Sequence, residues 1–350
     1  MQKSLYEPSW FLQNGLLMTL FNTFIASSNW EKTIPYGEPI YQEVIFTGAQ
    51  EVPIYGWVAI PKNPKGTIVA TYGIAGQLPN QWFLKLLGRK AYSLGYAVVL
   101  FDWRAHGKTA ELSPTLTSDG LYEGEDFVRI ASTAKTLGCP GKFWFVAYSL
   151  GGQLALWAGF AVTELFRGHH NLEITKDEVG GVAVICPSLD SARSLTYLQQ
   201  HPTGKILEKA IAKQLKKIAW RLYEIHPQNF NQQAIEAANS IWEFDEYLVI
   251  DTLGFPSVEA YYKASNALQI LPKLENSTLI IYACDDPLFD PAIIKDLQVA
   301  CKENPHIDLL LTQHGGHVGY LSSRKCQKFF QDSDKWWAWN RILQWIEEQS

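Results

Sequence analysis

Two stretches near the start of the chain alternate apolar and polar positions. Residues 39–47 read PIYQEVIFT, and residues 53–61 read PIYGWVAIP. A period of two is typical of strands that bury one face, and the short connection between the stretches predicts an antiparallel hairpin.

The pattern then changes to short, continuous apolar runs, which indicate strands buried on both faces, as in a parallel sheet. These runs lie at residues 67–72, 96–103, 143–148, 180–187, 277–284 and 306–312. Helical patterns lie between or after them, at residues 80–94, 124–137, 150–166 and 334–349. Strands that alternate with helices after an antiparallel start predict an α/β fold, with a mostly parallel sheet and helices on both of its faces.

One connection is far longer than a normal crossover between strands. Residues 190–275 hold several helical patterns of their own, so they predict a helical cap inserted into a core formed by residues 39–189 and 276–350. One pattern in this insertion combines an apolar stripe with a basic face made of Lys205, Lys209, Lys213, Lys216, Lys217 and Arg221. Such a helix can lie on anionic lipid, but its basic face is more often simply solvated.

The first residues, 1–38, predict a helical segment packed on the core. Residues 10–25 are apolar, but they are interrupted by Gln13, Asn14, Asn22 and Thr23. The stretch is too short and too polar for a membrane span, and it lacks the basic amino end of a signal peptide. We expect it to pack on the domain, with peripheral contact to a membrane as the alternative.

Composition narrows the classes of function. The chain of 350 residues has a net charge of −5 and no dominant basic block, which argues against a nucleic-acid partner. Its 5 cysteines are scattered without a C-x-x-C pair, so no disulfide framework or zinc site is indicated, and a cytoplasmic, reducing compartment is expected. Dinucleotide and P-loop motifs are absent as well, so the sequence predicts no cofactor and no metal.

A candidate nucleophile stands where the apolar run at residues 143–148 stops. Ala147-Tyr148-Ser149-Leu150-Gly151 matches the G-x-S-x-G nucleophile elbow, with alanine at the first small position. Small residues are needed there because the entering strand and the departing helix pass so close that side chains would collide. Ser149 is therefore a candidate nucleophile, although a serine before a helix can also be a simple N-cap.

A serine hydroxyl needs a base to take its proton, and the base needs an acid to orient it. Both should follow later strands, because the loops at the carboxyl ends of the strands converge above the sheet. The strand after the insertion ends in Asp285 and Asp286, and the last strand is followed by His314 and His317. We expect Asp286 to be the acid, with Asp285 holding the turn, and His317 to be the base, with His314 as the alternative.

The reaction also needs two backbone donors for the oxyanion of the tetrahedral intermediate. One is the N–H of Leu150, directly after the candidate nucleophile. The other is expected from the loop that reads Tyr72-Gly73-Ile74-Ala75-Gly76. Gly73 frees this backbone to turn inward, so Ile74 is the expected donor.

Together these motifs resemble the α/β-hydrolases and, more narrowly, the YheT-like branch of esterases. The resemblance is carried by AYSLGG, the DDP turn and GGHVGY, and also by YEPSWFLQNGLLMTL near the start and by EFD, GF and YYKAS late in the insertion. It implies a sheet of eight strands and a helical cap over the active site. Three features depart from the family: Tyr72 stands where histidine is usual, Ala147 stands where glycine is usual, and the loop after Asp286 reads PLFDP, with Asp290 just before the proline.

The leading hypothesis is a serine hydrolase that cleaves carboxylic esters through an acyl-enzyme. Aromatic residues in the insertion favour an apolar acyl or lipid-like substrate, although they can equally form its core. The alternatives are a hydrolase-fold protein that binds a ligand or partner without catalysis, and a membrane-associated lipase.

Overall fold

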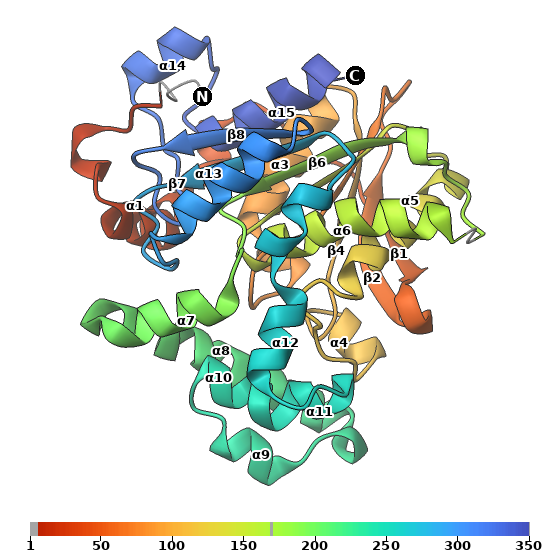
Figure 1. Ribbon diagram of the computed structural model, residues 1–350. Coiled ribbons are helices and arrows are strands. Elements are labelled where there is room, and N and C mark those ends of the chain that lie inside the picture. Colours follow the sequence, from red (N-terminus) through yellow and green to blue (C-terminus); the bar gives the residue numbers. More distant parts are fainter. Residues whose placement is uncertain (1–5, 169–170, 350) are drawn as a thin grey trace.

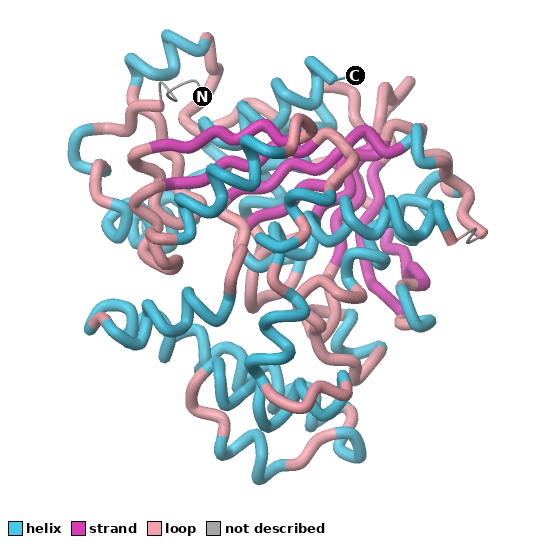
Figure 2. Tube along the Cα trace, viewed as in Figure 1, coloured by secondary structure: helices cyan, strands magenta, loops and turns pink. Residues whose placement is uncertain are grey.

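A twisted sheet of eight strands forms the centre of the computed structural model, which describes residues 6–168 and 171–349 (Figures 1 and 2). The strands are β1 (Gln42–Thr47), β2 (Pro53–Ala59), β3 (Thr67–Ala70), β4 (Ala97–Phe101), β5 (Phe143–Tyr148), β6 (Val179–Ile185), β7 (Thr278–Ala283) and β8 (Ile307–Thr312). Their order across the sheet is β1-β2-β4-β3-β5-β6-β7-β8. Strand β2 is antiparallel to both neighbours, and all later pairs are parallel. The predicted mostly parallel sheet with an antiparallel start is confirmed.

Helices flank this sheet (Figure 1). The main ones are α3 (Trp82–Ser93), α5 (Glu123–Thr136), α6 (Leu150–Arg167), α13 (Ile293–Glu303) and α15 (Trp337–Gln349). Helix α15 begins later than the apolar pattern suggests, because Asp334 is used elsewhere. The buried carboxylate of Asp334 pairs with Lys90 and accepts a hydrogen bond from the Trp336 N–H, which holds residues 334–336 in a turn. The sequence pattern did not reveal α13 or the short α14 (Arg324–Phe330).

A layer of helices lies between β6 and β7 in the chain and below the sheet in Figure 1. It contains α7 (Ser191–Gln200), α8 (Pro202–Ile225), α9 (Gln232–Ala237), α10 (Ile241–Phe244), α11 (Ile250–Leu253) and α12 (Val258–Ser265). The apolar stripe of α8 faces a hydrophobic cluster that is separate from the core around the sheet. Its lysines at 205, 209, 213 and 217 are exposed.

The N-terminal segment differs from the single stretch that its apolar pattern suggested. A 3₁₀ turn at Trp10–Leu12 precedes α1 (Gly15–Phe21), which continues into a π-helical turn at Asn22–Ala26. The break comes at Asn14, because its side chain accepts a hydrogen bond from the Leu17 N–H and so starts a new helix. Residues 1–5 of the segment expected at 1–38 lie outside the described part of the chain. Among the described residues, no helix combines the length and apolar character needed to cross a membrane.

Candidate active site

Ser149 lies between β5 and α6 in a backbone conformation that a serine rarely adopts, with φ 57° and ψ −133°. The surroundings hold it there: its N–H donates to the Ile185 carbonyl at 3.0 Å, and its own carbonyl accepts from the Gly152 N–H at 2.9 Å. A Cβ atom on Gly151 would lie 2.2 Å from the carbonyl oxygen of Tyr72. Glycine is therefore required at 151, because the turn packs directly against the end of another strand.

The two residues before Ser149 support the turn from within the core. Ala147 is fully buried in β5. Tyr148 is also buried, its hydroxyl donates a hydrogen bond to Gln81 Oε1 at 2.8 Å, and burial raises its pKa. Tyr148 stays neutral, so the residue beside Ser149 serves packing and adds no charge.

Ser149, His317 and Asp286 form one line of hydrogen bonds, although they come from three distant parts of the chain. The distance from Ser149 Oγ to His317 Nε2 is 2.8 Å, and that from His317 Nδ1 to Asp286 Oδ2 is 2.9 Å. With the proton on Nδ1, the imidazole donates to the carboxylate and leaves Nε2 to accept from the serine hydroxyl. This arrangement can transfer a proton from Ser149 to His317.

Asp286 is held for this contact by its own loop. Its carboxylate is buried, and Oδ1 accepts a hydrogen bond from the Leu288 N–H at 2.9 Å. The ring of Phe289 packs edge-on against the His317 ring, with 5.3 Å between their centres. The loop after β7 therefore fixes both the acid and one side of the imidazole.

The loop after β8 is held by the neighbouring aspartate and by the start of the chain. The Gly316 N–H donates to Asp285 Oδ1 at 2.9 Å, so Asp285 braces this loop. The His317 N–H donates to Thr19 Oγ1 in α1 at 2.8 Å. Sequence reasoning missed Thr19, since no motif links it to residue 317. His314 lies beside Asp285, with 3.4 Å between Nδ1 and Oδ2, and is not part of the line to Ser149.

The loop expected to bind an oxyanion passes over Ser149. A Cβ atom on Gly73 would lie 2.8 Å from the Cβ atom of Ser149. Further along, the Ala75 N–H donates to His106 Nε2 at 3.1 Å, while His106 Nδ1 donates to the Arg104 carbonyl at 2.9 Å. Burial lowers the pKa of His106 to about 4, which keeps its imidazole neutral and able to accept.

Tyr72, the residue in the usual histidine position, is tied to a buried carboxylate. Its hydroxyl donates to Asp102 Oδ1 at 2.5 Å, and the same oxygen accepts from the Leu78 N–H at 2.8 Å. The other oxygen accepts from the Lys108 N–H at 2.9 Å. Asp102, which directly follows β4 (Ala97–Phe101), therefore ties both ends of the loop to the neighbouring strand, and the departure from the family pattern leaves the loop braced.

A family model described as "Alpha/beta hydrolase family" matches residues 75–329, which span the serine, the acid and the histidine. This chain belongs to the alpha/beta hydrolase family. It is 51% identical to "Putative esterase slr0264" of Synechocystis, over 99% of this chain and 95% of the other. It is also 25% identical to "Putative esterase YheT" of Escherichia coli, over 57% of this chain and 54% of the other.

Among solved structures, the hydrolase resembles the Pyrococcus furiosus esterase Pf2001 in fold. The TM-score is 0.54 at 16% identity, and the match covers 88% of this chain and 92% of the other. The expected membership and the expected fold are both confirmed.

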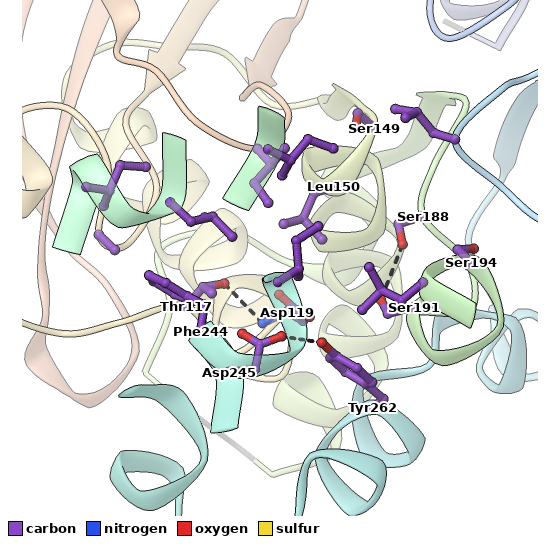
Figure 3. A pocket seen from close by; sticks show the side chains of 18 of the residues that line it. Thr117, Asp119, Ser149, Leu150, Ser188, Ser191, Ser194, Phe244, Asp245 and Tyr262 are labelled. Carbon is purple, nitrogen blue, oxygen red and sulfur yellow. Dashed lines mark hydrogen bonds between the residues drawn. The ribbon is translucent and has the colours of Figure 1, made fainter. Parts of the chain in front are cut away.

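In this hydrolase, Ser149 opens into a cavity between the sheet and the helical insertion (Figure 3). Ile74 and Leu150 line it beside the serine, and Leu150 is the first residue of α6, so its N–H is not used within the helix. Much of the cavity lining is apolar and includes Leu116, Leu195, Leu198, Ile211, Leu215 and Ile218. The empty space is about 910 Å³, part of it open to solvent.

The described residues contain no cluster of three or more His, Cys, Asp or Glu side chains that could hold a metal ion.

Proposed function

We propose that this protein is a serine hydrolase that cleaves carboxylic esters through an acyl-enzyme. The observation that carries the proposal is the hydrogen-bonded line from Ser149 through His317 to Asp286, which begins at a strained elbow and faces an apolar cavity. Backbone strain of this kind persists only where the surrounding structure holds it, and it is concentrated at functional sites.

In the proposed reaction, His317 Nε2 takes the proton of Ser149 as Oγ attacks the acyl carbon. The N–H groups of Leu150 and Ile74 stabilise the oxyanion, and Asp286 stabilises the imidazolium that forms. When the tetrahedral intermediate collapses, His317 gives its proton to the departing alcohol. Water then attacks the acyl-enzyme with the same histidine as base, and the acid and free Ser149 are released.

The apolar lining of the cavity supports an ester with an apolar chain. We propose that the insertion acts as a cap over this substrate, since its residues Leu195, Leu215 and Phe244 line the cavity that Ser149 faces. The names of the two curated relatives, both "Putative esterase", agree with an ester as substrate.

A fluorophosphonate probe, which reacts with activated serines, tests the proposal. The wild type should be labelled, and Ser149→Ala should not. Ser93→Ala, an exposed serine at the end of α3, is the matched control and should be labelled like the wild type. A folded wild-type protein that resists the probe would point to a binding protein without catalysis, and labelling of Ser149→Ala would show that another residue is the nucleophile.

A second candidate is a lipase that works at a membrane surface. It is favoured by large apolar side chains on the N-terminal segment, where Trp10 is 83% exposed and Phe24 71% exposed. The same segment contacts the His317 loop through Thr19. Co-flotation with anionic liposomes tests this second function by comparing the wild type with a Trp10→Ala/Phe24→Ala double variant. If the wild type and the variant are recovered equally in the unbound fraction, this second function is excluded.

A further inference from the structure

Two buried carboxyl groups line the cavity at the end away from Ser149 (Figure 3). Asp119 comes from the loop before α5, and Asp245 follows α10 in the helical insertion. Each is only 7% exposed. They therefore face each other across the junction between the core and the insertion, within the cavity that contains the candidate nucleophile.

This pair has no positive partner. Asp245 Oδ2 accepts a hydrogen bond from the Tyr262 hydroxyl, and the Asp119 backbone N–H donates to Thr117 Oγ1 at 3.1 Å. Within the part of the chain that the structure describes, neither carboxyl forms an ion pair with a lysine or arginine. Burial raises the pKa of Asp119 to about 7, with the nearby Glu123 carboxylate adding to this shift, and burial together with the Asp119 carboxylate raises the pKa of Asp245 well above its ordinary value.

Other buried carboxyl groups in this protein are well supplied with donors. Asp126 binds the guanidinium of Arg104 through both oxygens, at 2.8 and 2.9 Å. Glu123 accepts from Thr117, from the Ser118 N–H and hydroxyl, and from the Gly120 N–H. The pair at 119 and 245 has hydroxyl groups around its carboxyl oxygens, those of Thr117, Tyr261 and Tyr262, and it also lines the cavity.

A further polar group lines the same cavity, on the side of Ser188 and Ser191 (Figure 3). Ser194, in α7, is 5% exposed and lines this cavity, yet its Oγ has no hydrogen-bond partner among the described residues. A buried polar group without a partner costs about 1–3 kcal/mol, so such groups in a cavity are natural contacts for a polar ligand atom.

We propose that Asp119 and Asp245 recognise a hydrogen-bond donor, a hydroxyl or an ammonium group, at the end of an apolar substrate chain remote from the scissile ester. This inference rests on the proposed function. The apolar lining of the cavity holds the chain, and the carboxyl oxygens accept from its far end. Phe244 and Tyr262 line the same end and give an ammonium group aromatic faces to contact.

The proposal distinguishes substrates by their terminal group. A terminal methyl gives neither carboxyl group a new donor, and above a pH of about 7, where Asp119 is ionised, a terminal carboxylate or phosphate is repelled. In a wholly apolar pocket the preference between esters would be reversed: the ester with a terminal methyl would be favoured, because a terminal hydroxyl would lose its hydrating water and find no hydrogen-bond partner. The preference for a polar end is therefore diagnostic of the acid pair.

The test compares p-nitrophenyl esters of matched chain length, from hexanoate to dodecanoate, with a terminal methyl, hydroxyl, ammonium or carboxylate. At the best length, kcat/KM should be at least about tenfold higher for the hydroxyl or ammonium ester than for the plain alkyl ester, the factor expected of one good hydrogen bond. Assayed at about pH 8, above the pKa of about 7 of Asp119, Asp119→Asn should reduce the ammonium preference most, because it removes the charge but keeps an acceptor. Asp119→Leu should abolish both preferences. Glu246→Gln, an exposed acid beside Asp245, is the matched control and should change neither.

A direct binding measurement keeps the inference separate from the proposed reaction. Calorimetry with Ser149→Ala compares a straight-chain alcohol with the diol of the same length. Tighter binding of the diol, lost in Ser149→Ala/Asp119→Leu, supports the inference even if no ester is hydrolysed. If the plain alcohol binds as tightly, or if the plain ester is preferred at every length, the inference is overturned while ester hydrolysis itself stands.

Discussion

Replacing Gly151 with alanine should cripple the elbow, because the added methyl group has nowhere to go. It would lie 2.2 Å from the carbonyl oxygen of Tyr72 and 2.7 Å from its carbon. These are backbone atoms beyond the end of β3, an inner strand of the sheet, so they cannot rotate away as a side chain can. The start of α6 and the Tyr72 loop must therefore move apart by about 1 Å to reach ordinary contact distance.

Two quantities follow from this displacement. Overpacking in a core costs about 1–3 kcal/mol, and an alanine in a helix returns up to about 1 kcal/mol relative to glycine, so Gly151→Ala should lose about 2 kcal/mol of stability. The same movement separates Ser149 Oγ from His317 Nε2, which now lie 2.8 Å apart, and misplacement by about 1 Å can cost about 100-fold in rate. Denaturant unfolding measures the first quantity, and kcat/KM with a p-nitrophenyl ester measures the second.

Gly159→Ala, in the same helix, is the matched control. Its methyl group would meet only side-chain atoms, Val182 Cγ2 at 3.1 Å and Leu274 Cδ2 at 3.4 Å, which can shift slightly. We expect its stability to stay within about 1 kcal/mol of the wild type and its kcat/KM to be unchanged. If Gly151→Ala matches this control in both assays, the steric reasoning about the elbow is wrong.

Three further substitutions examine the support around the site. Tyr72→Phe removes a donor from buried Asp102 and should cost about 1–3 kcal/mol in denaturant unfolding and lower kcat, because the loop that carries Ile74 loosens; unchanged values would show that the hydroxyl braces nothing. Thr19→Val removes the acceptor for the His317 N–H and should lower kcat several-fold with KM nearly constant, whereas a change confined to KM would contradict a positioning role. Asp119→Asn should flatten the pH dependence of stability. The folded protein keeps the Asp119 proton up to a pKa of about 7, while the unfolded chain releases it near pH 4, so wild-type stability falls between these values by up to about 4 kcal/mol and is level above them. Parallel urea-unfolding curves for variant and wild type between pH 4 and 8 would refute this assignment.

The sheet and the line from Ser149 to Asp286 were predictable because both depend on local patterns in a fixed order. Continuous apolar runs located β3 to β8, and the strand ends located the elbow, the acid and the histidine. The small residues around Ser149 also indicated the elbow, because the backbone at Gly151 packs against the carbonyl group of Tyr72 and leaves no room for a side chain. Order along the chain placed the base after the last strand, and the two glycines before His317 favoured it over His314, which is only three positions away.

The remaining features depend on contacts between distant segments, which leave no periodic signal. The contact of Thr19 with the His317 loop joins two ends of the chain, and threonine in a helix is unremarkable by itself. The Asp119–Asp245 pair arises only when the insertion folds over the core. The break at Asn14 is local, but its apolar neighbours conceal it in a pattern read as one stretch.

The contact between α1 and the His317 loop also constrains how the protein is made. Residues 15–19 leave the ribosome well before their partners, Asp285 and Gly316, which are synthesised about 270 to 300 positions later, a delay on the order of tens of seconds. Throughout that time this apolar segment has no folded surface to pack against. Its proteolytic removal would leave a protein that folds around the serine but holds the histidine loop loosely. A preparation truncated at the amino end would then be soluble, well folded by spectroscopy and poorly active, so intact mass should be checked before any such protein is judged inactive.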